Sequence, residues 1–179
     1  MIRIFRYGIN KTYTIYNILL GVKIANGSLI HYRSDFRCHR NISIGSKTVL
    51  YKKLSIYMGK KGRFSIGNKS HIAPYAYFLI ENQTLTIGND VGIGLFCAFY
   101  CSSAIFSNDE PPFMNNLDQR DIKIGNNVVI GTHSIILPGT EIADNVFVAA
   151  NSLVKGKLES GWLYGGSPCK PIKKLDKND

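Results

Sequence analysis

Aliphatic residues recur at every sixth position through the C-terminal half of the chain. From Ile124 the sequence reads IGNNVV, IGTHSI, ILPGTE, IADNVF and VAANSL, and the next residue is Val154. The fifth place of each repeat holds a small or β-branched residue, namely Val128, Ser134, Thr140, Val146 and Ser152. A period of six fits neither an amphipathic helix nor an ordinary strand, so it indicates short straight segments separated by corners.

The same phase recurs earlier in the chain. It runs from Ile66 (IGNKSH, IAPYAY), again from Ile87 to Ile105, and more weakly from Ile44. Three six-residue segments close a triangular coil in which the first and fifth positions point inward and Gly, Asn and Asp serve the corners. One coil cannot bury its apolar face alone, so coils must stack and the ends need covers. We therefore predict an all-β fold, a parallel β-helix.

This pattern divides the chain into three parts. We expect the β-helix over residues 41–156, interrupted by a protruding loop at 106–121 where the repeat breaks. Residues 1–40 would form a basic N-terminal cap or arm. Residues 157–179, which include Trp162, Leu163 and Tyr164, would form a C-terminal cap and tail.

The N-terminal segment has two interpretations. It lacks an apolar run followed by a small-residue cleavage site, so we expect no signal peptide and a cytoplasmic protein. In one interpretation it is a helix or arm that packs on the end of the core. In the other it is a foot on the inner membrane surface, with basic residues toward lipid phosphates and apolar ones inserted: Arg3, Arg6 and Lys11, and Phe5, Tyr7 and Ile9.

Charge is placed unevenly along the chain. The net charge is +10, but residues 1–63 hold 13 Lys and Arg against the single acid Asp35, whereas residues 64–179 hold 9 against 11. The first part therefore carries +12 and the remainder −2. A basic N-terminal third fits an anionic partner, such as nucleic acid, an acidic glycan or anionic lipid, or a merely solvated surface.

The cysteines and histidines do not form a metal motif. Cys38, Cys97, Cys101 and Cys169 show no CxxC pair, and we expect free thiols. The four histidines show no grouping in repeat phase, so we expect no metal, and the pattern disfavours a zinc-dependent β-helix enzyme.

The stretch from Ile124 to Lys174, with its ILPGTEIADNVFVAANSLV run and the tail Gly166-Ser167-Pro168-Cys169-Lys170, resembles the hexapeptide-repeat acetyltransferases. The resemblance covers about residues 40–175 and extends to galactoside, maltose and bacterial-polysaccharide O-acetyltransferases. It implies a left-handed β-helix, acetyl-CoA as cosubstrate, and a homotrimer with active sites between protomers. It also implies a sugar or glycan acceptor, anionic or lipid-linked in view of the basic third, and no nucleic acid partner.

The resemblance further implies positions that contact the donor. Alignment without gaps to galactoside-type relatives places these contacts at Thr132, Ala150, Lys155 and Lys170. The two small residues leave room for a pantetheine arm, and the two lysines would meet nucleotide phosphates as point charges.

The catalytic base is not evident from the sequence. Relatives place a histidine in the loop that interrupts the repeat, but here the loop reads FSNDEPPFMNNLDQRD. Asp109 or Glu110 would serve if burial between subunits raised the pKa of the carboxyl. His71, whose repeat we expect to stack beneath the loop, is the second candidate, ahead of His133. In the third alternative the base is lost.

The sequence therefore predicts an acetyl-CoA-dependent O-acetyltransferase acting on a sugar hydroxyl, in the biosynthesis of a bacterial surface polysaccharide such as capsule or O-antigen. The alternatives are N-acetylation of an amino sugar and a non-catalytic β-helix trimer. Five aromatic residues are candidates to stack on a sugar ring, although Phe99 falls at an inward position: Tyr75, Tyr77, Phe96, Phe99 and Tyr100.

Overall fold

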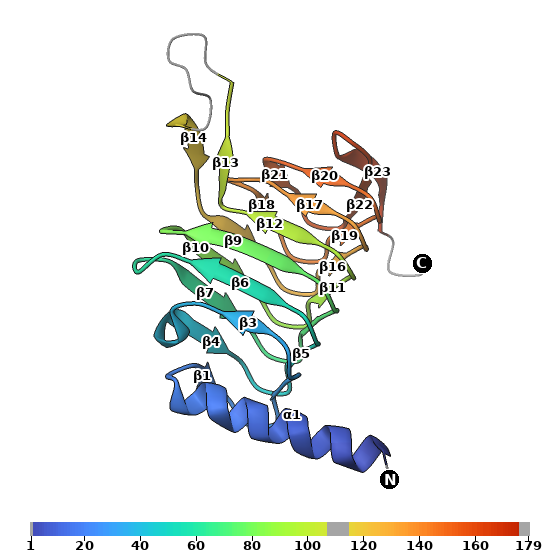
Figure 1. Cartoon of the computed structure of the whole chain (residues 1–179). Helices are drawn as coiled ribbons and strands as arrows, with labels where there is room; N and C mark the ends of the chain where they lie inside the picture. Colours follow the sequence, from blue (N-terminus) through green and yellow to red (C-terminus); the bar gives the residue numbers. More distant parts are fainter. Residues whose placement is uncertain (1, 107–114, 176–179) are drawn as a thin grey trace.

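The computed structural model describes residues 2–106 and 115–175, and it shows a left-handed parallel β-helix with one helix across its first end (Figure 1). The helix is α1 (Ile2–Leu19), and a short 3-10 turn, η1 (His39–Asn41), precedes the second coil. Each coil contributes one short strand to each of three sheets, which we name faces A, B and C.

The order of strands within each face follows the order of the coils. Face A consists of β1 (Lys23–Ile24), β4 (Ile42–Ile44), β7 (Arg63–Ile66), β10 (Thr84–Ile87), β15 (Ile122–Ile124), β18 (Glu141–Ile142) and β21 (Lys157–Leu158). Face B consists of β2 (Leu29–Ile30), β5 (Val49–Leu50), β8 (His71–Ile72), β11 (Gly92–Ile93), β16 (Val129–Ile130), β19 (Phe147–Val148), β22 (Trp162–Gly165) and β23 (Lys170–Lys174). Face C consists of β3 (Asp35–Phe36), β6 (Ser55–Met58), β9 (Tyr77–Glu81), β12 (Ala98–Tyr100), β17 (Ile135–Ile136) and β20 (Leu153–Val154).

The core is the column of side chains that the six-residue period places inward. Successive coils pair in register, so that Ile124 lies against Ile142 and Ile130 against Val148. The first positions of the C-terminal repeats are at most 3% exposed, and the fifth positions at most 2%. The predicted inward positions are thus confirmed. Phe99 is also buried, and its ring stacks on Phe78 with centroids 4.6 Å apart.

Asparagine and aspartate side chains join the coils along the edge between faces A and B. The Asn68 N–H donates to Asn89 Oδ1 (2.8 Å), the Asn89 N–H to Asn126 Oδ1 (2.9 Å), and the Asn126 N–H to Asp144 Oδ1 (2.6 Å). These bonds satisfy corner amides that have no strand partner. The backbone amide of Asn126 also holds the pKa of Asp144 below its ordinary value. The repeated Asn or Asp of the motif therefore serves coil stacking.

The β-helix begins earlier than the sequence pattern suggested. Parallel pairing starts with Lys23 against Ser43 and continues with Leu29 against Val49 and Asp35 against Ser55. The expected boundary at residue 41 therefore falls inside the stack, and only α1 and the turn that follows it form the N-terminal cap. At the other end β21 pairs in parallel with β18, and β22 pairs in parallel with β19. Strand β23 then folds back and pairs antiparallel with β22.

The helix α1 caps the first coil with polar side chains. Thr14 Oγ1 accepts a hydrogen bond from the Ile30 N–H (2.9 Å), and Asn10 Oδ1 accepts one from the Tyr32 N–H (3.1 Å). Asn10, Thr14 and Asn17 are all at most 7% exposed. The inward face of α1 is therefore the polar one, because the first coil presents unpaired backbone groups to its cap. Among the described residues, no helix is both long and apolar enough to span a membrane.

Candidate active site

A hairpin stem leaves the β-helix between faces C and A. Strand β13 (Ser102–Ala104) follows β12 directly and pairs antiparallel with β14 (Leu117–Gln119), which returns the chain to face A. The Ile105 N–H donates to the Asn116 carbonyl (2.9 Å), which extends the pairing beyond the strands. Figure 1 shows this hairpin projecting beside the C-terminal coils, at the end of the stack away from α1. The predicted interruption of the repeat is thus an ordered stem, whose tip lies outside the described residues.

Two of the predicted donor contacts lie together on the edge between faces B and C, which we call the B–C edge. Thr132 and Ala150 occupy the same corner in successive coils, and the Asn151 N–H donates to the Thr132 carbonyl (2.9 Å). A Cβ on Gly131 would lie 2.3 Å from the Ala150 nitrogen, so only glycine permits this approach. Ala150 is exposed. Gly131 therefore lets the two coils stack closely, and Ala150 places only a methyl group on the exposed edge, which suits a thin pantetheine arm.

The C-terminal tail brings Lys170 to the top of the same edge. The Leu153 N–H donates to the Gly166 carbonyl (3.0 Å), and the Cys169 N–H donates to the Leu153 carbonyl (2.9 Å). These bonds hold the segment 166–169 against the coil that carries Ala150. Lys170 follows directly and is exposed. An exposed lysine ammonium beside this edge can meet a phosphate.

Lys155 lies elsewhere. It follows β20 at the edge between faces C and A, where its Nζ is 3.6 Å from Asp118 Oδ2. Asp118 belongs to the hairpin stem and accepts two hydrogen bonds from Arg120, to Oδ1 at 2.6 Å and to Oδ2 at 2.5 Å. The hydrogen bonds from Arg120 are the main reason that the pKa of Asp118 lies below its ordinary value. The structure therefore separates Lys155 from the other three predicted contacts by the width of face C.

Face C, between the B–C edge and the hairpin, carries a ladder of outward tyrosines. Ring centroids of Tyr57 and Tyr77 are 5.7 Å apart, and those of Tyr77 and Tyr100 are 6.1 Å apart. Tyr100 lies at the foot of the hairpin. Partial burial raises the pKa of Tyr77, so its hydroxyl keeps its proton and can both donate and accept.

A second aromatic stack follows the B–C edge itself. Tyr75 stacks on Phe96 (4.9 Å, 18°), and Phe96 stacks on His133 (5.0 Å, 18°). All three residues have positive φ, 64°, 56° and 59° in that order, a conformation that is uncommon for bulky residues. The equivalent corners on the A–B edge carry Lys, Asp and Asn instead. Four of the five aromatic residues singled out from the sequence thus lie on the outside, in two stacks that the sequence did not distinguish.

The candidate bases differ in placement. His71 is exposed on β8 of face B, whereas the hairpin leaves face C. The expectation that its repeat stacks beneath the loop is therefore wrong within one protomer, because consecutive hexapeptides of a coil lie on different faces. Asp109 and Glu110 lie outside the described residues.

His133 is the histidine nearest to the predicted donor contacts. Its Nδ1 lies 3.3 Å from Thr132 Oγ1, and that hydroxyl donates to the Leu95 carbonyl (2.7 Å). Because the threonine proton is directed to the Leu95 carbonyl, the contact suits the tautomer that carries its proton on Nδ1, in which Nε2 is the acceptor.

The two fully buried cysteines are not suited to act as nucleophiles. All four are free, and Cys97 and Cys101 are fully buried. Burial raises the pKa of the Cys101 thiol to about 12, so it stays protonated at neutral pH. Within the described ranges 2–106 and 115–175, no group of three or more His, Cys, Asp or Glu side chains is placed to hold a metal ion.

A β-helix with a protruding hairpin, an edge of bare backbone and an exposed lysine above that edge defines the class of hexapeptide-repeat acyltransferases. Comparison with known proteins agrees. Residues 121–156 match the family model "Bacterial transferase hexapeptide (six repeats)". The Escherichia coli K12 protein WbbJ, named for O-acetyl transfer in lipopolysaccharide biosynthesis, is 35% identical over 167 residues, covering 89% of this chain and 85% of WbbJ. The chain belongs to the hexapeptide-repeat acyltransferases, which use coenzyme A thioesters, as the sequence predicted.

Two further comparisons find similar proteins that are named for acyl transfer to an amino sugar or to nitrogen. A dTDP-4-amino-4,6-dideoxy-D-glucose acyltransferase of Escherichia coli is 29% identical over 143 residues, covering 76% of this chain and 73% of that enzyme. Among solved structures, the S84T variant of AntD, a Bacillus cereus N-acyltransferase bound to dTDP and coenzyme A, superposes with a TM-score of 0.80 at 26% identity. That alignment covers 90% of this chain and 88% of the AntD chain.

Proposed function

We propose that this protein is an acetyl-CoA-dependent O-acetyltransferase that modifies a sugar hydroxyl during the biosynthesis of a bacterial surface polysaccharide. The observation that carries the proposal is the B–C edge at the C-terminal coils, where Thr132, Ala150 and Lys170 surround bare backbone. The similarity to WbbJ over most of both chains supports oxygen as the acceptor atom and a polysaccharide as the product.

The donor would lie along the B–C edge. The small, exposed side chain of Ala150 leaves space for the pantetheine arm, and Lys170 would meet the nucleotide phosphates. Thr132 borders the same space through its backbone and its ordered hydroxyl. Lys155 would meet the phosphates either across face C or from the neighbouring protomer of the trimer, and Asp118 already neutralises part of its charge.

The complete site would form between protomers of a homotrimer. Apolar side chains flank the B–C edge on both sides and are each between 38% and 47% exposed in a single chain: Leu95, Phe96, Val129, Ile135 and Phe147. Exposed apolar patches of this kind mark contact surfaces. Closed symmetry around a threefold axis would bury them and place the hairpin of one protomer beside the edge of the next.

The reaction would be a direct transfer. A general base takes the proton from the sugar hydroxyl, the oxygen attacks the thioester carbonyl, and backbone amides stabilise the oxyanion of the tetrahedral intermediate. Collapse of the intermediate expels the coenzyme A thiolate, which is then protonated. The base would come from the hairpin loop (Asp109 or Glu110) or from His71 of a neighbouring protomer. Buried, protonated Cys101 gives no support to an acyl-enzyme route.

The tyrosine ladder on face C suits a saccharide acceptor. Tyr77 and Tyr100 present rings and hydroxyls between the donor edge and the hairpin. Aromatic faces stack on the apolar faces of sugar rings, and hydroxyls bond the ring substituents. The basic first third of the chain supports an acceptor that is acidic or carried on a lipid phosphate.

A second candidate is N-acylation of an amino sugar. The similarity to the dTDP-4-amino-4,6-dideoxy-D-glucose acyltransferase over 76% of this chain favours it. An amine and a hydroxyl would occupy the same place beside the thioester, so the fold does not select between them.

The test is an assay of thiol release from acetyl-CoA with paired acceptors that differ only in an amino or a hydroxyl group. We expect turnover with hydroxyl acceptors and an acetyl ester that mild base removes. Exclusive turnover of the amino acceptors would replace the first proposal by the second. Thermal stabilisation by acetyl-CoA without thiol release for any acceptor would instead indicate a binding trimer.

A further inference from the structure

The outer surface of α1 is unusually apolar for the end of a soluble stack. With the polar side chains of α1 turned inward, its outer side presents large apolar residues with high exposed fractions: Tyr7 61%, Ile15 50%, Tyr16 52%, Ile18 46% and Leu19 80%. A cap that only shielded the core would place these side chains inward and its Asn and Thr outward. The reversed arrangement indicates that the outer side contacts something apolar.

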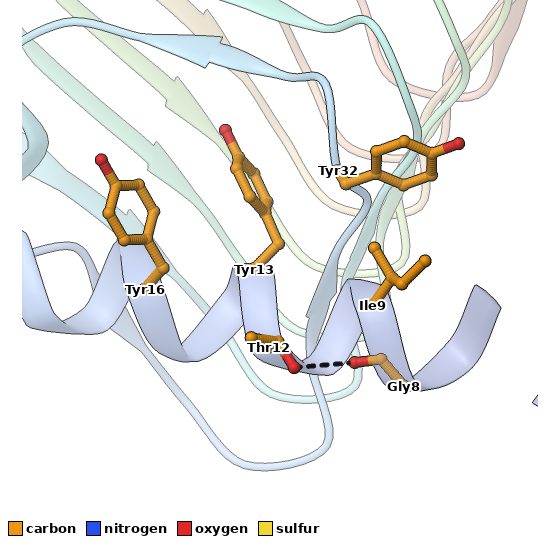
Figure 2. A pocket seen from close by; sticks show the side chains of 6 residues that line it. All are labelled: Gly8, Ile9, Thr12, Tyr13, Tyr16 and Tyr32. Carbon is orange, nitrogen blue, oxygen red and sulfur yellow. Dashed lines mark hydrogen bonds between the residues drawn. The ribbon is translucent and has the colours of Figure 1, made fainter. Parts of the chain in front are cut away.

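Two grooves flank the helix. One has a volume of about 620 Å³ and lies between α1 and the first coil, where Ile9, Tyr13, Tyr16 and Tyr32 form its walls (Figure 2). The other has a volume of about 470 Å³ and lies on the opposite flank, between Ile15 and Ile18 of α1 and the segment 24–29. The apolar region therefore continues from the crest of the helix down both of its sides.

Cations surround this apolar end. Residues 20–62, which form the first two coils, hold nine Lys and Arg and the single acid Asp35. The Asp35 carboxylate accepts a hydrogen bond from Tyr57 (2.5 Å), while the ion pairs found in the described part of the chain all involve residues 118–157. Strands of adjacent coils are about 4.8 Å apart. Both coils thus lie within about one to two Debye lengths of a plane that touches α1.

We propose that the α1 end of the stack docks on an anionic lipid bilayer, with α1 lying in the interface and the β-helix standing away from it. Apolar residues on the helix crest enter the boundary between headgroups and acyl chains, and the cations of the first two coils meet lipid phosphates. A second copy of the chain fits less well, because each copy would bring the same positive charge to the contact. This inference does not depend on the identity of the acyl acceptor.

The experiment is flotation of the full-length protein with vesicles of phosphatidylcholine alone or with about 30 mol% phosphatidylglycerol. We expect binding to the anionic vesicles that weakens as salt rises, and little binding to the neutral ones. The variant Ile15→Gln/Leu19→Gln changes two exposed positions and keeps good helix formers, so we expect about tenfold weaker binding without loss of folding. The variant Lys60→Gln/Lys61→Gln should weaken binding by about threefold to tenfold.

Matched controls lie in the C-terminal coils, away from α1. Ile172 is 59% exposed on β23, and Lys123 and Lys174 are exposed on β15 and β23. The variants Ile172→Gln and Lys123→Gln/Lys174→Gln should bind vesicles like the wild type. Equal binding by all variants, or absence of binding to anionic vesicles, would overturn the proposal. A change of oligomeric mass in Ile15→Gln/Leu19→Gln, measured by light scattering, would assign the surface to a second copy instead.

Discussion

The Lys155 ammonium lies 3.6 Å from the Asp118 carboxylate, and this contact joins the last complete coil of the β-helix to the returning strand of the hairpin. Arg120 holds the same carboxylate with two hydrogen bonds, and its own N–H donates to the Cys101 carbonyl (2.9 Å). The Asp118 carboxylate therefore ties the hairpin stem to the coil that carries Lys155, while the Arg120 backbone ties the stem to Cys101 at its foot.

We expect Asp118→Asn to lower kcat by about threefold to tenfold while the KM for acetyl-CoA changes little, because the hairpin loses its charged anchor and the donor edge lies on the other side of face C. Steady-state kinetics with acetyl-CoA varied would measure both constants. The control is Glu141→Gln, which removes a comparable but more exposed pair with Lys157 (3.3 Å, Glu141 47% exposed) and should have almost no effect. Equal effects of both variants would show that the hairpin is not specifically anchored.

The sign of the pH dependence at Asp118 follows from its lowered pKa. The stabilising contribution of the carboxylate is fully present above its unfolded pKa of about 3.9 and is lost as pH falls through the folded value. Activity changes between about pH 5 and pH 8 therefore come from another group.

Ala150→Leu should raise the KM for acetyl-CoA by about tenfold and leave the melting temperature near that of the wild type. The added carbons would project from the exposed edge next to Thr132, where the pantetheine arm is proposed to lie, and Ala150 is exposed, so the core is not disturbed. Isothermal titration with coenzyme A gives the affinity directly. Ala143→Leu makes the same change on the edge between faces A and B, and it should bind coenzyme A normally. Unchanged affinity in Ala150→Leu would move the donor away from this edge.

The catalytic base can be assigned with four substitutions. One of His71→Gln, Asp109→Asn and Glu110→Gln should lower kcat/KM by about 10²–10⁴ and remove the acidic limb of its pH profile, whereas the other two should have small effects. His133→Gln tests the alternative that His133, whose Nδ1 contacts Thr132, supplies the base through Nε2. A large loss confined to His133→Gln would contradict the proposed base. Circular dichroism and light scattering of each variant would separate lost chemistry from lost assembly.

Much of the fold could be predicted because every coil of a β-helix carries the same six-residue pattern of inward and outward positions. Ile130 and Ser134 are buried as the six-residue period requires, and each sits above an equivalent residue of the next coil. The first coil carries the same signal in Ile24, Ile30 and Phe36, but without the Ile-Gly pairs that punctuate the later repeats. The weaker signal of the first coil explains why the sequence pattern predicts a later boundary than the structure shows.

The site was less predictable, because its residues meet only through stacking and folding back. Nothing in the local sequence of Lys155 shows that Asp118 of the hairpin lies beside it. Alignment to galactoside-type relatives assigns Lys155 and Thr132 to the same donor site from their positions along the chain. In the structure, face C separates the two side chains. Likewise, the helical period of α1 identifies its faces but not which of them turns inward. That choice depends on the unpaired backbone of the first coil.

Thr14→Val should destabilise the cap of the β-helix by about 1–3 kcal/mol, because it leaves the buried Ile30 N–H without the threonine oxygen that now accepts from it at 2.9 Å. Thr14 Oγ1 in turn donates to the Asn10 carbonyl (2.8 Å), a bond that valine also removes. Thr12→Val is the matched control, because the exposed Thr12 hydroxyl bonds only the Gly8 carbonyl (3.1 Å) of its own helix and should change stability by less than about 0.5 kcal/mol. Hydrogen exchange at Ile30 reports the local loss, and thermal unfolding reports the global one. If exchange at Ile30 were equally protected in both variants, the polar face of α1 would not be what closes the first coil.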